Sequence, residues 1–117
     1  MDPQVIDLVD VLERVQGDKD LLLELLDIFV DDYQKKRKFL EKSVHDNDSG
    51  QTHSLAHSLK GAAGNIGAKA LFETFSKLDQ MAKSHNLSEA PGVLAEMAER
   101  FENLKQCIVS LKKEFQH

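Results

Sequence analysis

One run of apolar residues near the C-terminus constrains the fold more than any other feature of the sequence. Its members alternate at spacings of three and four residues, and they are Leu94, Met97, Phe101, Leu104, Ile108, Leu111 and Phe115. That spacing places all of these side chains on one stripe of an α-helix, as in the seam of a bundle whose helices pack nearly parallel to one another. The stripe therefore predicts a helical bundle.

The rest of the chain shows the same helical period, and no segment alternates as a strand would. The expected helices cover about residues 3–15, 18–45, 51–66, 68–85 and 88–115. The expected caps and turns are Asp2-Pro3, Gly17-Asp18, Asn47-Asp48-Ser49-Gly50, Gly67, and Asn86 with Ser88. Short turns between long helices make neighbours antiparallel. We therefore predict an all-α fold, an antiparallel up-down four-helix bundle with a short additional N-terminal helix across one end.

The length of 117 residues fits a single domain, residues 1–117, with one continuous core. The single cysteine, Cys107, excludes an intrachain disulfide and a cysteine metal cage. At a net charge of −5 the chain has no electrostatic reason to bind nucleic acid or anionic lipid. The basic run Lys35-Lys36-Arg37-Lys38 follows Asp31-Asp32, so we interpret it as a solvated helix face. We see no signal peptide or membrane span and expect a cytoplasmic protein.

The helix expected at residues 51–66 departs from the pattern of the others. Its apolar side is made of Leu55, Ala56, Leu59, Ala62, Ala63 and Ile66. Helical spacing places on the opposite side His53, His57, Lys60, Gly61 and Gly64. A glycine on an exposed helix interior costs about 0.5–1 kcal/mol relative to alanine. Two of them on one face therefore indicate a use other than stability.

The surroundings of His57 suggest what that use is. Gly61, four residues on, is its nearest neighbour along the ridge, and the missing side chain leaves the imidazole open to a large partner. Gly64 widens the same clearing. Lys60, three residues after His57, can reach a group attached to the ring. An open imidazole beside a cation suits a transient anion on the ring nitrogen, and phosphate is the obvious candidate.

A nucleophilic histidine also needs an acceptor that holds one ring nitrogen and leaves the other free. His57 lies ten residues before Gly67, and Asp79 lies twelve residues after it. An antiparallel pair of helices that turns at Gly67 places the two side chains nearly level. We therefore expect Asp79 to orient His57. The alternative is a solvated carboxylate or an ion pair with Lys83, four residues on.

Two other interpretations of these residues stay open. His57 could be an ordinary surface histidine of a purely structural bundle, with the glycines allowing close helix packing. His53 and His57, four residues apart, could instead share a metal ion. A stable metal site needs a third and a fourth ligand, and Cys107 is not placed to supply one.

The residues Ala56-His57-Ser58-Leu59-Lys60-Gly61, followed by Gly67 and Leu71, resemble the motif of histidine-containing phosphotransfer (HPt) domains. Gly17-Asp18, Phe29 and the turn at Asn47-Asp48 also fit the pattern of that family, so the resemblance covers most of the chain. It implies that His57 is phosphorylated on Nε2, that Lys60 neutralises the phosphoryl oxygens and that Gly61 gives access. The family usually has glutamine or glutamate at the position of Asp79. With the shorter aspartate we expect either a direct hydrogen bond to Nδ1 or one through water.

The resemblance also implies the partners. The module would take a phosphoryl group from an aspartate of one response-regulator receiver domain and pass it to another, in a multistep two-component phosphorelay with a hybrid sensor histidine kinase. Acting as a phosphate sink is the variant of this role. The sequence has neither a P-loop nor a carboxylate cluster for magnesium, so we expect a phosphocarrier and not an enzyme. We expect a monomer without a cofactor, with Mg²⁺ supplied by the receiver. Docking candidates are Leu8, Leu12 and Leu21.

Overall fold

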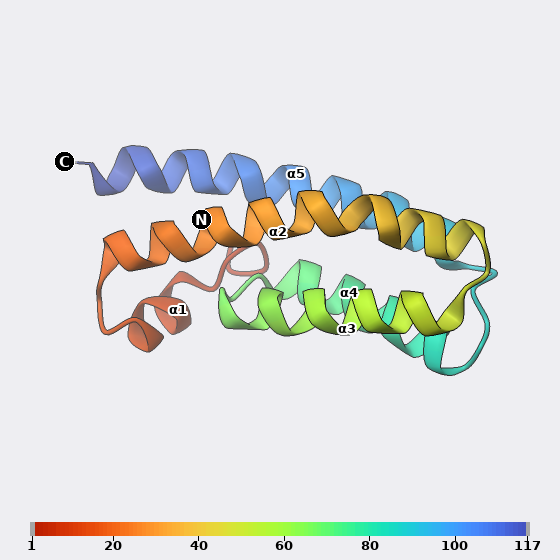
Figure 1. Cartoon of the computed structure of the whole chain (residues 1–117). Coiled ribbons are helices and arrows are strands. Elements are labelled where there is room, and N and C mark those ends of the chain that lie inside the picture. The colour runs from red at the N-terminus through yellow and green to blue at the C-terminus, as the bar shows by residue number, and fades with distance from the viewer. Residues whose placement is uncertain (1, 117) are drawn as a thin grey trace.

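Five α-helices account for most of the residues that the computed structural model describes, which are residues 2–116 (Figure 1). They are α1 (Leu8–Arg14), α2 (Lys19–His45), α3 (Ser49–Asn65), α4 (Lys69–Lys83) and α5 (Ala90–Phe115). No strand occurs within that span, so the all-α prediction is confirmed. Over the same residues, no helix is long and apolar enough to cross a membrane.

The four long helices lie side by side along the length of the molecule (Figure 1). Each contacts two of the others, because α3 packs against α2 and α4, and α5 packs against α4 and α2. At one end α2 and α5 extend beyond the turn that joins α3 to α4. The short helix α1 lies beneath the extended part of α2 and contacts it there.

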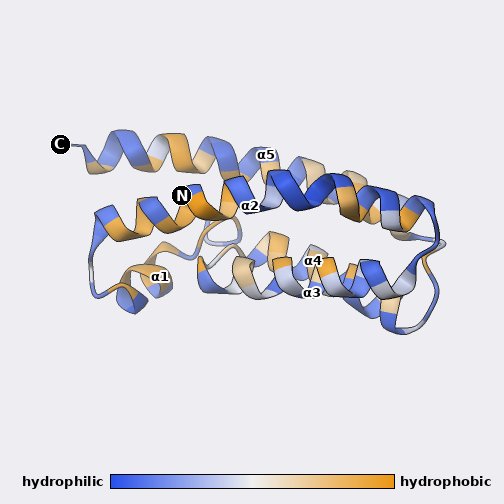
Figure 2. Ribbon diagram, in the orientation of Figure 1, coloured by the Kyte–Doolittle hydropathy of each residue, from blue (hydrophilic) through white to orange (hydrophobic). Residues whose placement is uncertain are grey.

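The apolar stripes of the helices face the interior of this bundle, as the orange faces in Figure 2 show. The buried residues of α5 include five from the predicted stripe, which are Met97, Phe101, Leu104, Ile108 and Leu111. Tyr33 of α2 stacks on Phe101, with the ring centroids 3.9 Å apart. The paler colour of α3 reflects its alanines and glycines, which take the place of larger apolar side chains.

Local hydrogen bonds explain where the helices begin and turn. The backbone N–H three residues further on donates to the side chains of Asp7, Asp18 and Asp48, which cap α1, α2 and α3. Gly67 makes the turn from α3 to α4 with a φ of +69°, in the left-handed region that glycine adopts without strain. This turn is the predicted one.

The first helix is shorter than the predicted span of about residues 3–15. The Asp7 N–H donates to the Gly67 carbonyl at 2.8 Å, and the Gln4 carbonyl accepts from the first turn of α4 at 2.7 Å. These non-local bonds dock the N-terminal segment on the α3–α4 turn and use backbone groups that a helix would need internally. The predicted cap at Asp2-Pro3 is therefore wrong, and Asp7 is the cap.

Three other helix ends also differ from the predicted bounds. The third helix begins before residue 51 because Asp48 caps it. The fifth begins after residue 88, since the N–H and hydroxyl of Ser88 both donate to the Asn86 side chain and hold Ser88 in the turn. The fourth ends before residue 85, where His85 itself adopts a φ of +52°.

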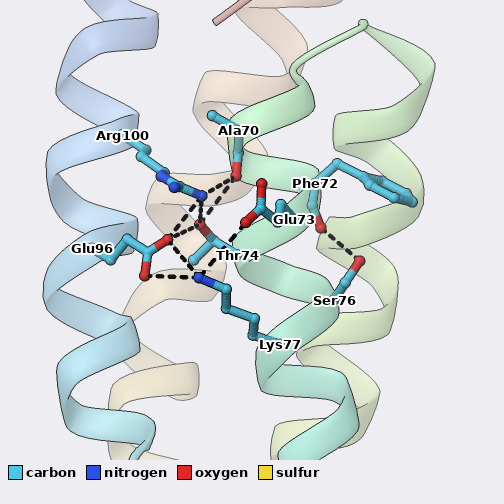
Figure 3. A network of polar contacts seen from close by, with 8 residues as sticks. All are labelled: Ala70, Phe72, Glu73, Thr74, Ser76, Lys77, Glu96 and Arg100. Carbon is cyan, nitrogen blue, oxygen red and sulfur yellow. Dashed lines mark hydrogen bonds and ion pairs between the residues drawn. The ribbon is translucent and has the colours of Figure 1, made fainter. Parts of the chain in front are cut away.

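A polar network fastens α4 to α5 (Figure 3). One nitrogen of the Arg100 guanidinium donates to the Ala70 carbonyl and to the Thr74 hydroxyl, each at 2.8 Å. The same nitrogen lies 2.8 Å from the Glu96 carboxylate, which also pairs with Lys77 at 3.1 Å. Thr74 is fully buried, so the network reaches the interior. It fixes the position of α4, the helix that carries the predicted acceptor of the histidine.

Replacing Tyr33 by phenylalanine should raise the free energy of unfolding by about 1 kcal/mol, because an unpaired hydroxyl is then no longer buried. The Tyr33 hydroxyl makes no hydrogen bond within the described residues, and burial raises the pKa of Tyr33 to about 12. Urea unfolding followed by circular dichroism measures the change. The control Tyr33→Leu, which loses the stack on Phe101, should destabilise the fold. A destabilised Tyr33→Phe would show that the hydroxyl has a partner.

Candidate functional site

His57 lies near the middle of α3 and faces away from the core. The buried residues of this helix are Thr52, Ala56, Leu59 and Ala63, which form its inner stripe. The side chain of His57 lies off that stripe and is 66% exposed. The imidazole is thus held on a rigid helix that is packed against both α2 and α4. It is open to a partner molecule.

The two glycines of this face have different surroundings. A Cβ added at Gly61 would meet no atom within 4 Å, so the space beside it is open, as the sequence predicted. A Cβ added at Gly64 would lie 3.5 Å from the ring of Phe72 on α4. Gly64 therefore makes room for an aromatic side chain, and its contribution to access is smaller than the sequence suggested.

Lys60 occupies the edge between α3 and α4. Its Nζ lies 5.6 Å from the centroid of the Phe72 ring, over the ring face, which is an attractive geometry for a cation. Phe72 itself is 40% exposed. The ring thus holds the ammonium group of Lys60 by a cation–π contact, on the face of α3 that also carries His57.

Asp79 of α4 is only 2% exposed, and its carboxylate points at α3. Its Oδ2 lies 3.6 Å from Nδ1 of His57, so the predicted pair is brought together, slightly beyond hydrogen-bond length. Its Oδ1 lies closer to another imidazole, at 2.5 Å from Nδ1 of His53. Lys83 also contacts it, with Nζ 3.5 Å from Oδ2. The Asp79 carboxylate therefore lies beside His57, beside Lys83, which was the alternative partner, and beside His53.

The charge state of Asp79 follows from these contacts. Burial is the largest influence and raises the pKa of Asp79, but the hydrogen bond from His53 and the charge of Lys83 outweigh it. The pKa of Asp79 therefore lies below its usual value of 3.8, and the carboxylate is ionised at neutral pH. An ionised carboxylate only accepts hydrogen bonds. Because it faces Nδ1 of His57, it favours the tautomer of His57 with hydrogen on Nδ1, in which Nε2 carries a free lone pair.

Grooves border α3 on both sides. Towards α4, a groove of about 230 Å³ is lined by Gly64 and Phe72 together with Arg14 of α1. Towards α2, a groove of about 350 Å³ is lined by residues that include Ile28 and Ala62. Both grooves lie towards the C-terminal end of α3, and His57 lines neither of them.

The predicted docking residues differ in exposure. Leu21 is 39% exposed, whereas Leu8 and Leu12 are partly buried against the core. Sequence reasoning missed Phe72 and Ile28, which are 40% and 57% exposed. Each directly neighbours a buried residue of its helix, so the apolar pattern alone did not separate them from the core.

His53 entered the sequence analysis only as a possible metal ligand. In the structure its Nδ1 contacts the Asp79 carboxylate, and its side chain is 42% exposed. No cluster of three or more histidine, cysteine, aspartate or glutamate side chains placed to hold a metal ion occurs between residues 2 and 116. The four-residue spacing from His57 places both imidazoles on one ridge of α3, but it does not show that this ridge faces Asp79.

Comparison with family models identifies one family. The model of the Hpt domain family matches residues 24–107. Histidine-containing phosphotransfer protein B from Pseudomonas aeruginosa PAO1 is 29% identical with a TM-score of 0.78, over 92% of this chain and 91% of that one. The HPT domain of a sensor hybrid histidine kinase from Shewanella is 14% identical with a TM-score of 0.82, over 99% and 100%. The second likeness shows the fold alone. Among curated proteins the sequence comparison finds no significant relative.

Replacing Asp79 by asparagine should lower the free energy of unfolding at neutral pH, because the folded state holds the ionised carboxylate better than the unfolded chain does. The pKa of Asp79 is lowered on folding. Its contribution is therefore present above pH 3.8 and is lost as the pH falls through the lower pKa of the folded state. Urea unfolding of both proteins across the acid range measures the difference, which should shrink towards zero.

The exposed Asp27, changed to asparagine, controls for the loss of one negative charge. Its ion pair with Lys112 lies at the surface, where such pairs contribute about 0–1 kcal/mol. An Asp79→Asn protein as stable as wild type at neutral pH would contradict the prediction.

Proposed function

The chain belongs to the Hpt domain family, and from that premise we propose that His57 is its phosphate carrier. Histidine phosphotransfer within a phosphorelay is the role of this family. In the proposal, His57 accepts a phosphoryl group from an aspartate of one receiver domain and passes it to an aspartate of another. The observation that carries the proposal is the exposed imidazole of His57, with open space at Gly61 and the ionised Asp79 carboxylate facing its Nδ1.

The chemistry is a reversible transfer between an acyl phosphate and an imidazole. The Nε2 lone pair of His57 attacks the phosphorus of the receiver's aspartyl phosphate. An N–P bond forms, the P–O bond to the aspartate breaks, and the aspartate leaves as a carboxylate. Transfer to the second receiver reverses these steps. Such transfers depend mainly on alignment and charge neutralisation, so a rigid helix can serve without further machinery.

Each neighbour of His57 has a role in this proposal. Lys60 supplies positive charge to the phosphoryl oxygens, leaving its position over the Phe72 ring to do so. Gly61 gives the receiver access. Asp79 stabilises the Nδ1–H and the positive charge that the ring gains when Nε2 is phosphorylated. Gly64 has a smaller part, because it accommodates the Phe72 ring.

The remaining parts of the proposal concern the whole chain. We propose a single domain over residues 1–117, of which Met1 and His117 lie outside the described residues, arranged as an antiparallel up-down bundle with an additional N-terminal helix. It acts as a cytoplasmic monomer with response-regulator receivers and a hybrid sensor histidine kinase as partners. It is a carrier and not an enzyme. It has no cofactor of its own, since the receiver supplies Mg²⁺.

Incubation with a phosphorylated receiver domain tests the proposal. Labelled phosphate should move to the chain as an adduct that is labile in acid and stable in base, and His57→Gln should abolish it. The control His45→Gln changes an exposed histidine of α2 and should leave the transfer unchanged. If the wild-type chain takes no label from any of a panel of receivers, the proposal is wrong.

Two substitutions of Gly61 should affect the stability of the fold and the rate of transfer differently. Because a Cβ at Gly61 meets open space, Gly61→Ala should raise the free energy of unfolding by about 0.5–1 kcal/mol. The larger Gly61→Leu should slow transfer by about 100-fold, because the receiver can no longer align with the imidazole. Urea unfolding and the transfer assay measure the two effects.

Gly92 provides the matched control, since a Cβ there also meets nothing within 4 Å and the residue lies on α5. Gly92→Leu should transfer at the wild-type rate. Equal rates for Gly61→Leu and wild type would show that the clearing is not used for access.

A further inference from the structure

Two histidines of α3 share the carboxylate of Asp79, and the second one holds it more closely. Nδ1 of His53 lies 2.5 Å from Oδ1, whereas Nδ1 of His57 lies 3.6 Å from Oδ2. The two imidazoles are neighbours one turn apart, with ring centroids 5.6 Å apart and planes inclined at 35°. The proposed phosphotransfer reaction assigns no task to His53.

The hydrogen bond from His53 limits how the carboxylate can rotate. Asp79 is 2% exposed, so it has little access to water that could replace a lost protein partner. With Oδ1 bound to His53, Oδ2 is directed at His57 and Lys83. Without that bond, the carboxylate would be free to turn towards the ammonium of Lys83. His57 would then lose the acceptor that faces its Nδ1.

We propose that His53 is a positioning residue of the phosphotransfer site. It donates its Nδ1–H to Oδ1 of Asp79 and thereby keeps Oδ2 opposite Nδ1 of His57. The hydrogen of His57 then stays on Nδ1, and Nε2 remains unprotonated. His53 itself does not touch the phosphoryl group. The inference rests on the proposed role of His57 for its effect on transfer, but its effect on the His57 tautomer does not depend on that role.

The effect of losing Lys83 can be compared with the effect of losing His53. Lys83 also contacts Asp79, but its side chain is 52% exposed and its Nζ lies 3.5 Å from Oδ2. Its charge favours the ionised carboxylate, but at 3.5 Å it lies beyond hydrogen-bond length and so fixes the orientation of the carboxylate less firmly than His53 does. Loss of Lys83 should therefore leave the carboxylate in place, whereas loss of His53 should release it.

Three substitutions of His53 test the role. His53→Asn puts an amide N–H close to the position of Nδ1 and should keep the hydrogen bond. His53→Gln carries its amide one bond further from the backbone and should misplace it, and His53→Ala removes the donor. NMR of the imidazole nitrogens reports which nitrogen of His57 carries the hydrogen. The hydrogen should stay on Nδ1 in wild type, His53→Asn and Lys83→Gln, and move towards Nε2 in His53→Gln and His53→Ala.

The transfer rate gives the second readout. His53→Gln and His53→Ala should accept phosphate about 10-fold more slowly, which is the size of effect found when a metal-bound histidine loses its outer hydrogen-bond partner, whereas His53→Asn should retain most of the rate. The fold of each variant is checked by circular dichroism. If His53→Ala does not fold, the comparison of asparagine with glutamine still decides the matter.

The outcomes separate this inference from the proposed function. If the His53 variants shift the His57 tautomer but the wild-type chain takes no phosphate from any receiver, the phosphotransfer role of His57 is overturned and the positioning role of His53 is supported. Normal transfer by wild type with equal tautomers and rates in the asparagine, glutamine and alanine variants would overturn the positioning role alone. A Lys83→Gln variant that matches the effects of His53→Ala would also overturn it, since general charge near Asp79 would then be sufficient.

Discussion

The antiparallel closure of α3 onto α4 is the constraint on which the candidate site depends. Gly67 makes this turn in the left-handed region, and a Cβ there would lie 3.2 Å from the Asp7 carbonyl oxygen. The absence of a side chain at Gly67 therefore lets the N-terminal segment pack closely on the turn. From this fixed point the regular rise of the two helices brings His57 and Asp79 level. The geometry of the site is thus set at a turn well away from it.

The buried carboxylate is the costly element of this arrangement. A charge taken out of water needs partners, and Asp79 finds them in His53 and Lys83, which hold its pKa below the usual value despite burial. The network around Arg100 holds α4 against α5 and so keeps the carboxylate at a fixed depth. A free carboxylate on a mobile surface helix could not specify one tautomer of His57. Burial fixes the orientation of the Asp79 carboxylate, and its hydrogen-bonded and charged partners offset the cost of burying the charge.

Features that depend on local spacing could be predicted from the sequence, and features that depend on non-local pairing could not. The period of the apolar residues gave the helices and the buried stripe of α5, and counting from Gly67 placed Asp79 opposite His57. The start of α1 was misplaced because Asp7 pairs with a residue sixty positions away. The contact of His53 with Asp79 depends on how α3 is rotated against α4. Spacing along one helix does not determine that rotation.

The helix that carries His57 is poor in large apolar side chains, and the proposed phosphocarrier role explains this composition. An open face around an imidazole requires small residues, and glycines there weaken the helix that displays the histidine. The bundle can carry such a helix because the long stripe of α5 and the Tyr33–Phe101 stack supply large side chains to the core, whereas the buried residues of α3 are Thr52, Ala56, Leu59 and Ala63. In the proposed function, core packing and access to the imidazole therefore depend on different helices. Packing in the other helices offsets the helix stability that is lost at Gly61, so the space beside His57 stays open in a stable fold.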